Sequence, residues 1–367
     1  MEALLRARGL RVGKYTSPHL VDFRERILLD GRAVSEDAVT DWVARWTAEC
    51  ERLGATFFEA TTAMAFDLMA AARVDAAIVE VGLGGRLDST NVVTPRVAGV
   101  VSIGMDHTEY LGDTLEQIAD EKAGIFKPGV PAVIGERDPA VRERLAQRAR
   151  EAGASQVRVI ADVVTPENVH VDAQGTAFEA AWGEGTLALR TGLSGRFQAQ
   201  NALVALVMLD AAGAPFRPTL DEVRATLPTV RLPGRFHREG EFIFDVAHNP
   251  DGAKVLADTL REVETERPLV ALLGVLADKD WRGMIEALAP AVDAFVLTDP
   301  PTAPASRAWK ADEAGAHAER HRPTTVEHDF DAAIARARAL GRTVLVTGSF
   351  HTVGDAMARL QVRPLSG

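Results

Sequence analysis

Short apolar runs rich in Val, Ile and Leu alternate with longer amphipathic stretches along the whole chain of 367 residues. The short runs have the length and the β-branched content of buried strands, whereas the longer ones carry apolar residues at helical spacing. Regular alternation of this kind is typical of an α/β protein with a mainly parallel sheet. The hydrophobic pattern therefore predicts the fold class before any single residue is considered.

After residue 10, the first part of the chain contains four predicted strands, five predicted helices and a patch of short antiparallel strands. The strands are expected at residues 11–16, 76–81, 97–103 and 131–134. The helices are expected at residues 35–53, 56–73, 114–123, 139–152 and 198–212. The antiparallel patch is expected at residues 157–190.

A break in the pattern falls in "LPTVRLPGRF", residues 227–236, where two prolines and a glycine interrupt the alternation. A second α/β series follows, with strands expected at residues 242–246, 269–275, 294–298, 324–328 and 343–347. We therefore predict a larger N-terminal domain over residues 1–234 and a smaller C-terminal domain over residues 235–367.

Composition narrows the class of protein. The formal net charge is −11 and no basic stripe offsets it, which argues against a nucleic-acid partner. No apolar run reaches the roughly 18 residues that a membrane span needs, and the N-terminus lacks the apolar segment of a signal peptide. Cys50 is the single cysteine and cannot form an internal disulfide. We expect a cytoplasmic protein without a membrane partner.

The densest chemical signal is "IVEVGLGGRLDSTNV", residues 78–92. A strand of buried type delivers Glu80 to its carboxyl end, and a glycine-rich loop follows, at the edge where open parallel sheets bind ligands. A dinucleotide fingerprint fails because Leu87 stands where its third glycine would be. A carboxylate beside a loop rich in N–H groups suits Mg²⁺ and phosphate oxygens. The simpler alternative is a strand-end carboxylate that faces solvent.

A second strand of buried type leads into Asp106-His107, and a helix that carries Lys122 follows. If the two strands are neighbours, His107 and Glu80 lie close enough to share a cation. Ser17 precedes a proline that stiffens its loop, which would hold the hydroxyl towards a ligand or simply form a rigid turn. Lys122 on its own is equally consistent with a solvated helix end.

The C-terminal half repeats this arrangement. "FIFDVAHNPDG" places Asp245, His248 and Asn249 directly after an apolar strand. "GVLADKD" and "VTGSFHTVGD" likewise put polar residues after apolar runs.

Taken together, these stretches resemble the folylpolyglutamate synthase/dihydrofolate synthase family of the Mur ligase superfamily. The matching segments occur in family order over nearly the whole chain. They are "YTSPHL", "EVGLGGRLDSTNV", "SIGMDHTEYLGDTLEQIADEKAGIFKPG", "FQAQNA", "LPGRF", "DVAHNP", "LADKD" and "TGSFHTVGD". The resemblance implies an ATP-binding domain of P-loop type and a smaller Rossmann-like C-terminal domain. It also implies an ATP-dependent ligase that adds L-glutamate to dihydropteroate or to the γ-carboxylate of a folate, through an acyl phosphate.

Residue roles follow from the resemblance position by position. Ser17, Glu80 and His107 are implied as Mg²⁺ ligands. Lys122 matches a lysine that is carbamylated in many members. Together with His107, Asp245 and His248 it makes up the implied catalytic set. Asn201, Arg235, Asp245 and His248 are the implied nucleotide contacts. K⁺ is a further candidate ion, and a monomer is expected.

Two departures from the family pattern stand out. Val246 occupies a position that is commonly glycine. No G-K-[ST] phosphate loop precedes residues 11–16, although members carry one there. The helix expected at residues 1–8 also has no capping residue before it. We therefore expect that Met1 is an internal methionine and that the natural protein is longer.

Two alternatives stay open at this point. One is a homologue without turnover that binds folate or nucleotide, and the other is a Mur-type ligase with a different acid substrate. A dehydrogenase is disfavoured by the failed glycine fingerprint.

Overall fold

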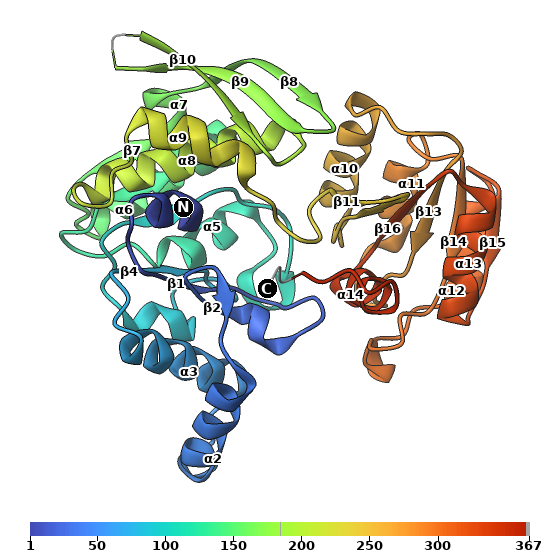
Figure 1. Cartoon of the computed structure of the whole chain (residues 1–367), viewed down its shortest axis with the longest axis horizontal. Coiled ribbons are helices and arrows are strands. Elements are labelled where there is room, and N and C mark those ends of the chain that lie inside the picture. The colour runs from blue at the N-terminus through green and yellow to red at the C-terminus, as the bar shows by residue number, and fades with distance from the viewer. Residues whose placement is uncertain (184, 365–367) are drawn as a thin grey trace.

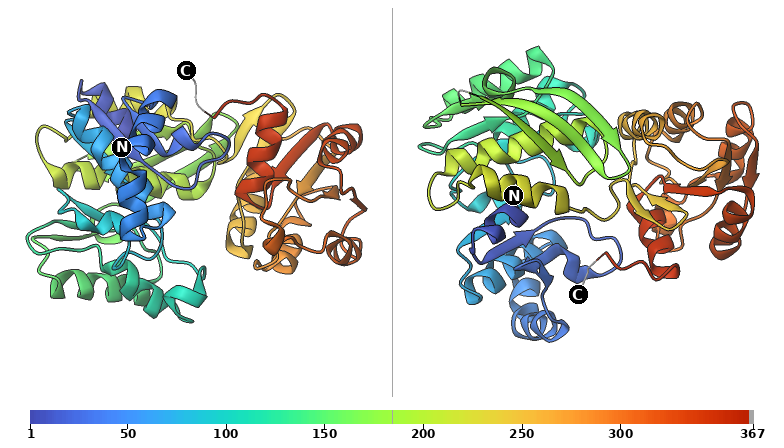
Figure 2. Two further views of the ribbon diagram at one scale, coloured as in Figure 1. Left: turned by 90° about the horizontal axis from the view of Figure 1, so that it is seen from below. Right: turned by 45° about the horizontal axis from the view of Figure 1, so that its top comes forward.

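The computed structural model describes residues 1–183 and 185–364, and it forms two lobes that lie side by side (Figure 1). The first lobe contains helices α1–α9 and strands β1–β10, and the second contains α10–α14 and β11–β16. Figure 2 shows the lobes from two further sides, with the chain crossing between them after α9. The predicted boundary between residues 234 and 235 lies in this crossing, and we keep it as a proposal.

The first lobe contains three separate sheets. One has the order β3-β2-β1-β4, the second β5-β6-β7 and the third β10-β9-β8. Its strands are β1 (Val12–Tyr15), β2 (Ile27–Leu29), β3 (Arg32–Ala33), β4 (Ala76–Val79), β5 (Ala98–Val100), β6 (Ala132–Ile134), β7 (Val157–Val159), β8 (Pro166–Asp172), β9 (Gly175–Trp182) and β10 (Gly185–Thr191).

The helices of the first lobe surround these sheets. They are α1 (Glu2–Ala7), α2 (Glu36–Leu53), α3 (Phe57–Ala71), α4 (Thr108–Leu111), α5 (Leu115–Ala123), α6 (Pro139–Glu151), α7 (Ile160–Val163), α8 (Arg196–Ala212) and α9 (Leu220–Thr226). Short 3₁₀ turns are η1 (Phe23–Arg26), η2 (Ser89–Val92) and η3 (Leu227–Thr229). Helix α8 is apolar on most of its surface because it lies at the centre of this lobe and packs against β5, β6 and the third sheet.

The second lobe is built on one six-stranded sheet with the order β11-β12-β16-β13-β14-β15. Its strands are β11 (His237–Glu239), β12 (Phe242–Phe244), β13 (Leu269–Leu273), β14 (Ala294–Leu297), β15 (Thr324–Val326) and β16 (Thr343–Thr347). Its helices are α10 (Pro250–Glu262), α11 (Trp281–Leu288), α12 (Ala311–Ala318), α13 (Phe330–Leu340) and α14 (Phe350–Arg359), with a 3₁₀ turn η4 (Ala305–Arg307). Apart from the antiparallel edge strand β11, its neighbouring strands are parallel.

The predicted elements agree with the structure except at three places. The antiparallel patch starts at β8, because β7 pairs in parallel with β6. The strand expected to be buried at residues 76–81 is β4, which has no residue in the buried class because only β1 pairs with it. The strand expected at residues 97–103 ends at Val100, so Asp106 and His107 lie on a loop.

The expectation that these two strands are neighbours is wrong. Strands β4 and β5 are edge strands of different sheets, and no ladder joins them in the described part of the chain. Each has hydrogen bonds along one side only, to β1 and β6 respectively. Glu80 and His107 therefore cannot be placed together by strand adjacency alone.

Candidate active site at the junction of the lobes

Glu80 directly follows β4 at the carboxyl end of the strand. Its Oε2 accepts a hydrogen bond of 2.9 Å from the backbone N–H of Ser17, at the carboxyl end of the neighbouring strand β1. Partial desolvation by neighbouring residues raises the pKa of Glu80, although the residue is exposed, and that N–H and the charges of Arg235 and Lys14 oppose the rise. Since Oε1 has no hydrogen-bond donor among the described residues, this carboxylate retains a free oxygen for a cation.

The glycine-rich loop after Glu80 is closed by Asp88. One oxygen of Asp88 accepts from the N–H groups of Gly82 and Leu83, at 3.1 and 2.9 Å. Gly85 lies so close to helix α5 that a Cβ would be 2.9 Å from the carbonyl oxygen of Glu121. A side chain at Gly85 would push the loop away from the helix that carries Lys122.

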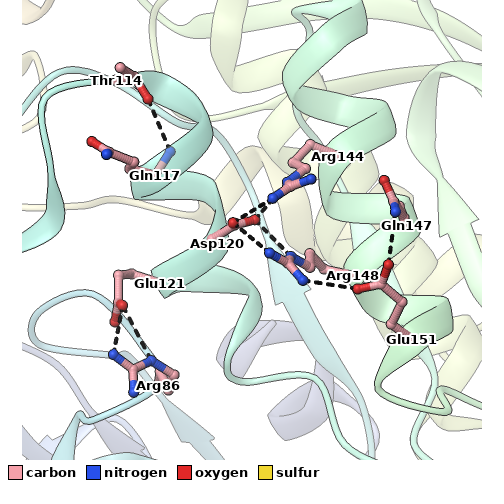
Figure 3. Close-up of polar contacts among 9 residues, drawn as sticks. All are labelled: Arg86, Thr114, Gln117, Asp120, Glu121, Arg144, Gln147, Arg148 and Glu151. Carbon is pink, nitrogen blue, oxygen red and sulfur yellow. Dashed lines mark hydrogen bonds and ion pairs between the residues drawn. The ribbon is translucent and has the colours of Figure 1, made fainter.

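Helix α5 is fixed by ion pairs on both sides (Figure 3). Arg86 from the glycine loop pairs with Glu121 at 2.8 Å. On the opposite side, Arg144 and Arg148 of α6 both hold Asp120, each through an Nη2–Oδ2 contact of 2.7 Å. These contacts position the last turn of α5, where Lys122 lies.

The ammonium group of Lys122 makes no hydrogen bond or ion pair with the described residues. Burial lowers the pKa of Lys122, while the charges of Asp106 and Asp88 act in the opposite direction. By contrast, Lys127 donates to the carbonyl oxygens of Asn91 and Val93. Of the two lysines, Lys127 therefore has a structural role and Lys122 remains available for chemistry.

The loop that carries Asp106 and His107 is held at its start by Glu136. The buried carboxylate of Glu136 accepts N–H bonds from Ile103 at 2.5 Å, Arg137 at 2.6 Å and Asp138 at 2.8 Å. His107 has a left-handed backbone with φ of 54° and begins α4. Burial lowers the pKa of His107. Sequence reasoning missed Glu136, because a lone acidic residue after a strand gives no distinctive pattern.

The second lobe contributes Arg235 and Asp245. The two carboxylate oxygens of Asp245 accept from the N–H of Phe236 at 2.9 Å and that of Ala247 at 3.0 Å. Burial raises the pKa of Asp245, and the charge of Arg235 opposes this. The guanidinium of Arg235 lies over the ring of Phe350, 5.7 Å from its centroid. Because Arg235 acts on both Glu80 and Asp245, it links acidic groups of the two lobes.

Asp106 forms the second link between the lobes. Its Oδ1 accepts from Nζ of Lys279 at 2.7 Å, and its Oδ2 lies 3.2 Å from Nε2 of His248. Nδ1 of His248 lies 2.9 Å from the carbonyl oxygen of Val246. Both partners of the ring are acceptors, so it makes both bonds only when both nitrogens carry protons. These contacts hold the pKa of Asp106 well below its ordinary value.

The eight predicted site residues fall into three groups. Ser17, Glu80, Arg235 and Asp245 form one cluster, and His107, Lys122 and His248 surround Asp106 in a second. The loop from Asp245 to His248 connects the two clusters. Asn201 of α8 belongs to neither, since the hydrogen bond of its side chain goes to Gln198, at 3.1 Å. Asn249 caps α10 through the N–H of Gly252 at 2.8 Å.

Sequence reasoning did not select Asp106 and Lys279 as site residues. Both lie in stretches that it quoted, "MDH" and "LADKD", next to residues that drew more attention. Their partners are about 170 positions away along the chain. A single sequence gives no signal for such a pairing.

The types of donor in the two clusters suit a divalent cation together with anionic phosphates. Glu80 supplies a free carboxylate oxygen, Ser17 a hydroxyl, and His107 an imidazole whose lowered pKa keeps it neutral at pH 7. Carboxylate and hydroxyl oxygens are the ligands that Mg²⁺ takes in proteins. Arg235 and Lys279 bring positive charge to the same junction, as phosphoryl transfer requires.

Comparison with known families matches both lobes to Mur ligases. Residues 39–209 match the Mur ligase middle domain, and residues 234–350 match the Mur ligase glutamate ligase domain. No helix among the described residues has the length and apolar character needed to span a bilayer.

Individual relatives cover the whole chain. A dihydrofolate synthase/folylpolyglutamate synthase of Escherichia coli is 36% identical over 100% of this chain and 84% of its own length. The structure of the E. coli protein in complex with DHPP and ADP has a TM-score of 0.87 at 34% identity, covering 99% of this chain and 84% of that one. A bifunctional folylpolyglutamate synthase/dihydrofolate synthase with Mn, AMPPNP and L-glutamate bound has a TM-score of 0.85 at 35% identity, covering 98% and 85%.

These matches extend over both lobes at more than 30% identity, and they agree with the acidic and cationic clusters at the junction. The chain therefore belongs to the dihydrofolate synthase/folylpolyglutamate synthase family of ATP-dependent Mur ligases.

Proposed function

We propose that this protein uses ATP to join L-glutamate to dihydropteroate, to the γ-carboxylate of a folate, or to both. The observation that carries the proposal is the junction of the lobes, where Asp106 contacts Lys279 and His248. At the same junction the charge of Arg235 acts on Glu80. Relatives bind a nucleotide, DHPP, a divalent metal ion and L-glutamate. Mg²⁺ is the proposed physiological ion, with K⁺ as a candidate second ion. A monomeric state and a cytoplasmic location stay predictions.

The metal ligands proposed are Glu80, His107 and Ser17. A bound Mg²⁺ would neutralise phosphate oxygens as charge moves between ATP and the acid substrate. Glu80 has the free oxygen and His107 the neutral ring that this role needs. The N–H of Ser17 fixes the orientation of the Glu80 carboxylate, so that its free oxygen keeps one direction.

The nucleotide contacts proposed are Asn201, Arg235, Asp245 and His248, to which the structure adds Lys279 as a candidate. Arg235 and Lys279 are permanent cations at the junction, and Asp245 is held by two backbone N–H groups. Lys279 is paired with Asp106 in the structure, so an incoming phosphate must compete for it. A closed junction excludes water, which protects an acyl phosphate until the glutamate amine attacks.

Lys122 is proposed to carry a carbamate. The reaction with CO₂ needs a neutral amine, and the lowered pKa of Lys122 increases the neutral fraction near pH 7. The product is an anion in place of a cation, close to the loop that carries His107. Such a group would add an oxygen ligand for the metal, together with Glu80.

A groove of about 500 Å³ beside the glycine loop is proposed to hold the acid substrate. It is lined by Phe66, Arg86, Asp88 and Ser89, among others. Phe66 offers a ring surface for an aromatic substrate, and Arg86 a charge for a carboxylate. The groove lies on the side of the glycine loop that faces α3 and η2.

The test is glutamate-dependent release of ADP by the purified protein. Dihydropteroate and tetrahydrofolate are offered separately, with Mg²⁺ and K⁺ present. ADP release that requires both glutamate and one of the acids supports the proposal and identifies the acid. If neither acid supports ADP release while titration calorimetry still detects folate or nucleotide binding, the protein is a binder without turnover and the proposal is wrong.

A further inference from the structure

A second group of metal-ligating side chains lies in the second lobe, outside the two clusters of the junction. Glu286 of α11, His317 of α12 and His321 just after α12 each offer one ligand atom, and these atoms lie within 4.8 Å of one another. His321 lies three residues beyond the end of α12, in the turn that follows it. The rings of His317 and His321 are 5.2 Å apart between centroids.

His317 is the buried member of this group. It is 8% exposed and packs edge-to-face on Trp281 of α11, with 5.7 Å between the ring centroids. Its Nε2 atom is buried and has no hydrogen-bond partner among the described residues, although Oε1 of Glu286 lies 3.2 Å away. A buried polar atom without a partner is costly. The carboxylate of Glu286 approaches this nitrogen without making a hydrogen bond to it, so the group contains a buried ligand atom that a metal ion would satisfy.

We propose that Glu286, His317 and His321 bind a divalent transition metal ion, with Zn²⁺ as the best fit. Two imidazole nitrogens and one carboxylate form a ligand set that Zn²⁺ takes in proteins, with a fourth position open to water. Mg²⁺ is disfavoured here because it prefers sites made of oxygen ligands. The metal would bridge α11 and the end of α12, which pack against each other.

Arg320 controls whether the ring of His317 is available to a metal ion. Its Nη2 group donates to Nδ1 of His317. Accepting at Nδ1 places the proton of a neutral ring on Nε2, which faces Glu286. A metal at Nε2 needs the other tautomer, so Arg320 must release the ring when the ion binds. Arg320 is therefore a competitor of the metal rather than a ligand.

The other charges around the ring are consistent with a neutral, ligand-ready His317. Burial and the charge of Arg320 lower the pKa of His317, and Glu286 opposes this. Arg282 of α11 also faces the group, but it pairs with Glu313 and lies over the ring of Trp281, 4.0 Å from the centroid. Arg282 therefore has its own partners and can remain in place when an ion binds.

The test counts Zn²⁺ equivalents by equilibrium dialysis in excess Mg²⁺, which occupies magnesium sites. The parent protein is compared with His321→Asn and with Arg320→Gln. His170→Asn, which removes an exposed histidine from β8, is the matched control. We expect His321→Asn to bind one equivalent fewer than the parent and His170→Asn to equal it. Arg320→Gln should bind the ion about tenfold more tightly, because it removes the guanidinium that competes with the metal for the ring of His317.

Two results would overturn the proposal. One is an equal number of equivalents in the parent and in His321→Asn. The other is a crystal soaked in Zn²⁺ that shows no anomalous peak between the three side chains. Glu286→Gln supplies an independent check, since it removes a ligand charge from a partly exposed position of α11 without touching the buried ring. It should weaken binding, and unchanged affinity would contradict the carboxylate's role.

Discussion

The two lobes have the same α/β sequence pattern but differ in how their strands are arranged into sheets and buried. In the second lobe, β12, β13 and β16 lie side by side in one sheet and every residue of these strands is buried. In the first lobe, the strands are divided among three sheets, and β4 has no buried residue. The second lobe is therefore a rigid platform, whereas the first depends on loops and ion pairs to place its functional groups.

The difference shows where each lobe keeps its chemistry. The acidic groups of the first lobe are oriented by side chains and by single N–H bonds: Ser17 orients Glu80, Glu136 holds the loop of His107, and Asp120 fixes α5. The second lobe presents Asp245 and His248 shortly after β12, a fully buried strand that is paired on both sides. Contacts between the lobes then bring two sets of groups together. Those of the second lobe follow a buried strand, whereas those of the first lobe are held by local contacts.

The largest expected effect comes from Glu80, the strand-end carboxylate of the first lobe. Glu80→Gln should lower kcat/KM by about 10²–10³-fold, because it removes charge where metal and phosphate meet. Steady-state ADP release measures this. Glu167→Gln, which changes an exposed carboxylate of β8, is the charge control and should stay within twofold of the parent. Full activity in Glu80→Gln would remove this residue from the metal site.

The contrast in packing predicts a difference in stability. Leu272→Ala in β13 empties a fully buried position and should cost about 2–5 kcal/mol of unfolding free energy. Ile78→Ala in β4 deletes the same kind of group from a half-buried position and should cost about half as much. Urea denaturation followed by circular dichroism measures both. Equal losses would mean that the edge strand is as well packed as the central one.

Substitutions of Lys122 test whether this position carries a negative charge in the active protein. Lys122→Met should lower activity by about 10²-fold, whereas Lys122→Glu, which restores an anion, should recover part of it. Labelled ¹³CO₂ should give a carbamate signal in NMR of the parent protein that Lys122→Met lacks. If the signal is the same in both proteins, the carbamate is elsewhere or absent.

The contact between the lobes through Asp106 and Lys279 should show a measurable coupling. In a double-mutant cycle of Asp106→Asn and Lys279→Met, we expect a coupling free energy of about 1 kcal/mol, the usual size for a partly buried pair. Thermal unfolding supplies the four values. Two separate unfolding transitions in the single variants would show that this pair holds the lobes together. A coupling of zero would show that the lobes are joined elsewhere.

The smallest expected effect is the pH dependence that Glu80 contributes to stability. Its raised pKa means that the folded state holds this proton to higher pH than the unfolded chain does. Above the pKa that Glu80 has in the folded protein, the parent protein is therefore less stable than Glu80→Gln. Below the ordinary pKa of glutamate this difference is absent. Without metal, Glu80→Gln should melt at a slightly higher temperature at pH 7 and equally at pH 4. A lower melting temperature at pH 7 would contradict the sign.

The sequence by itself determined the elements of this protein and most of its chemistry. Hydrophobic spacing is a local property, so it located strands such as residues 343–347 and helices such as α5 within a few positions. Motifs such as "EVGLGGRLDSTNV" and "DVAHNP" carried Glu80, Asp245 and His248 in the same way, because each lies next to its strand.

Only the tertiary structure decided which of these residues meet. Strand pairing and contacts between lobes depend on groups far apart along the chain, and periodicity contains no information about them. For this reason β4 and β5 were wrongly expected to be neighbours, and Asp106 with Lys279 was overlooked. The same reason applies to Glu286 and His317, whose nearness arises from the packing of α11 on α12. Burial and charge at those meeting points then set the pKa values on which the chemistry depends.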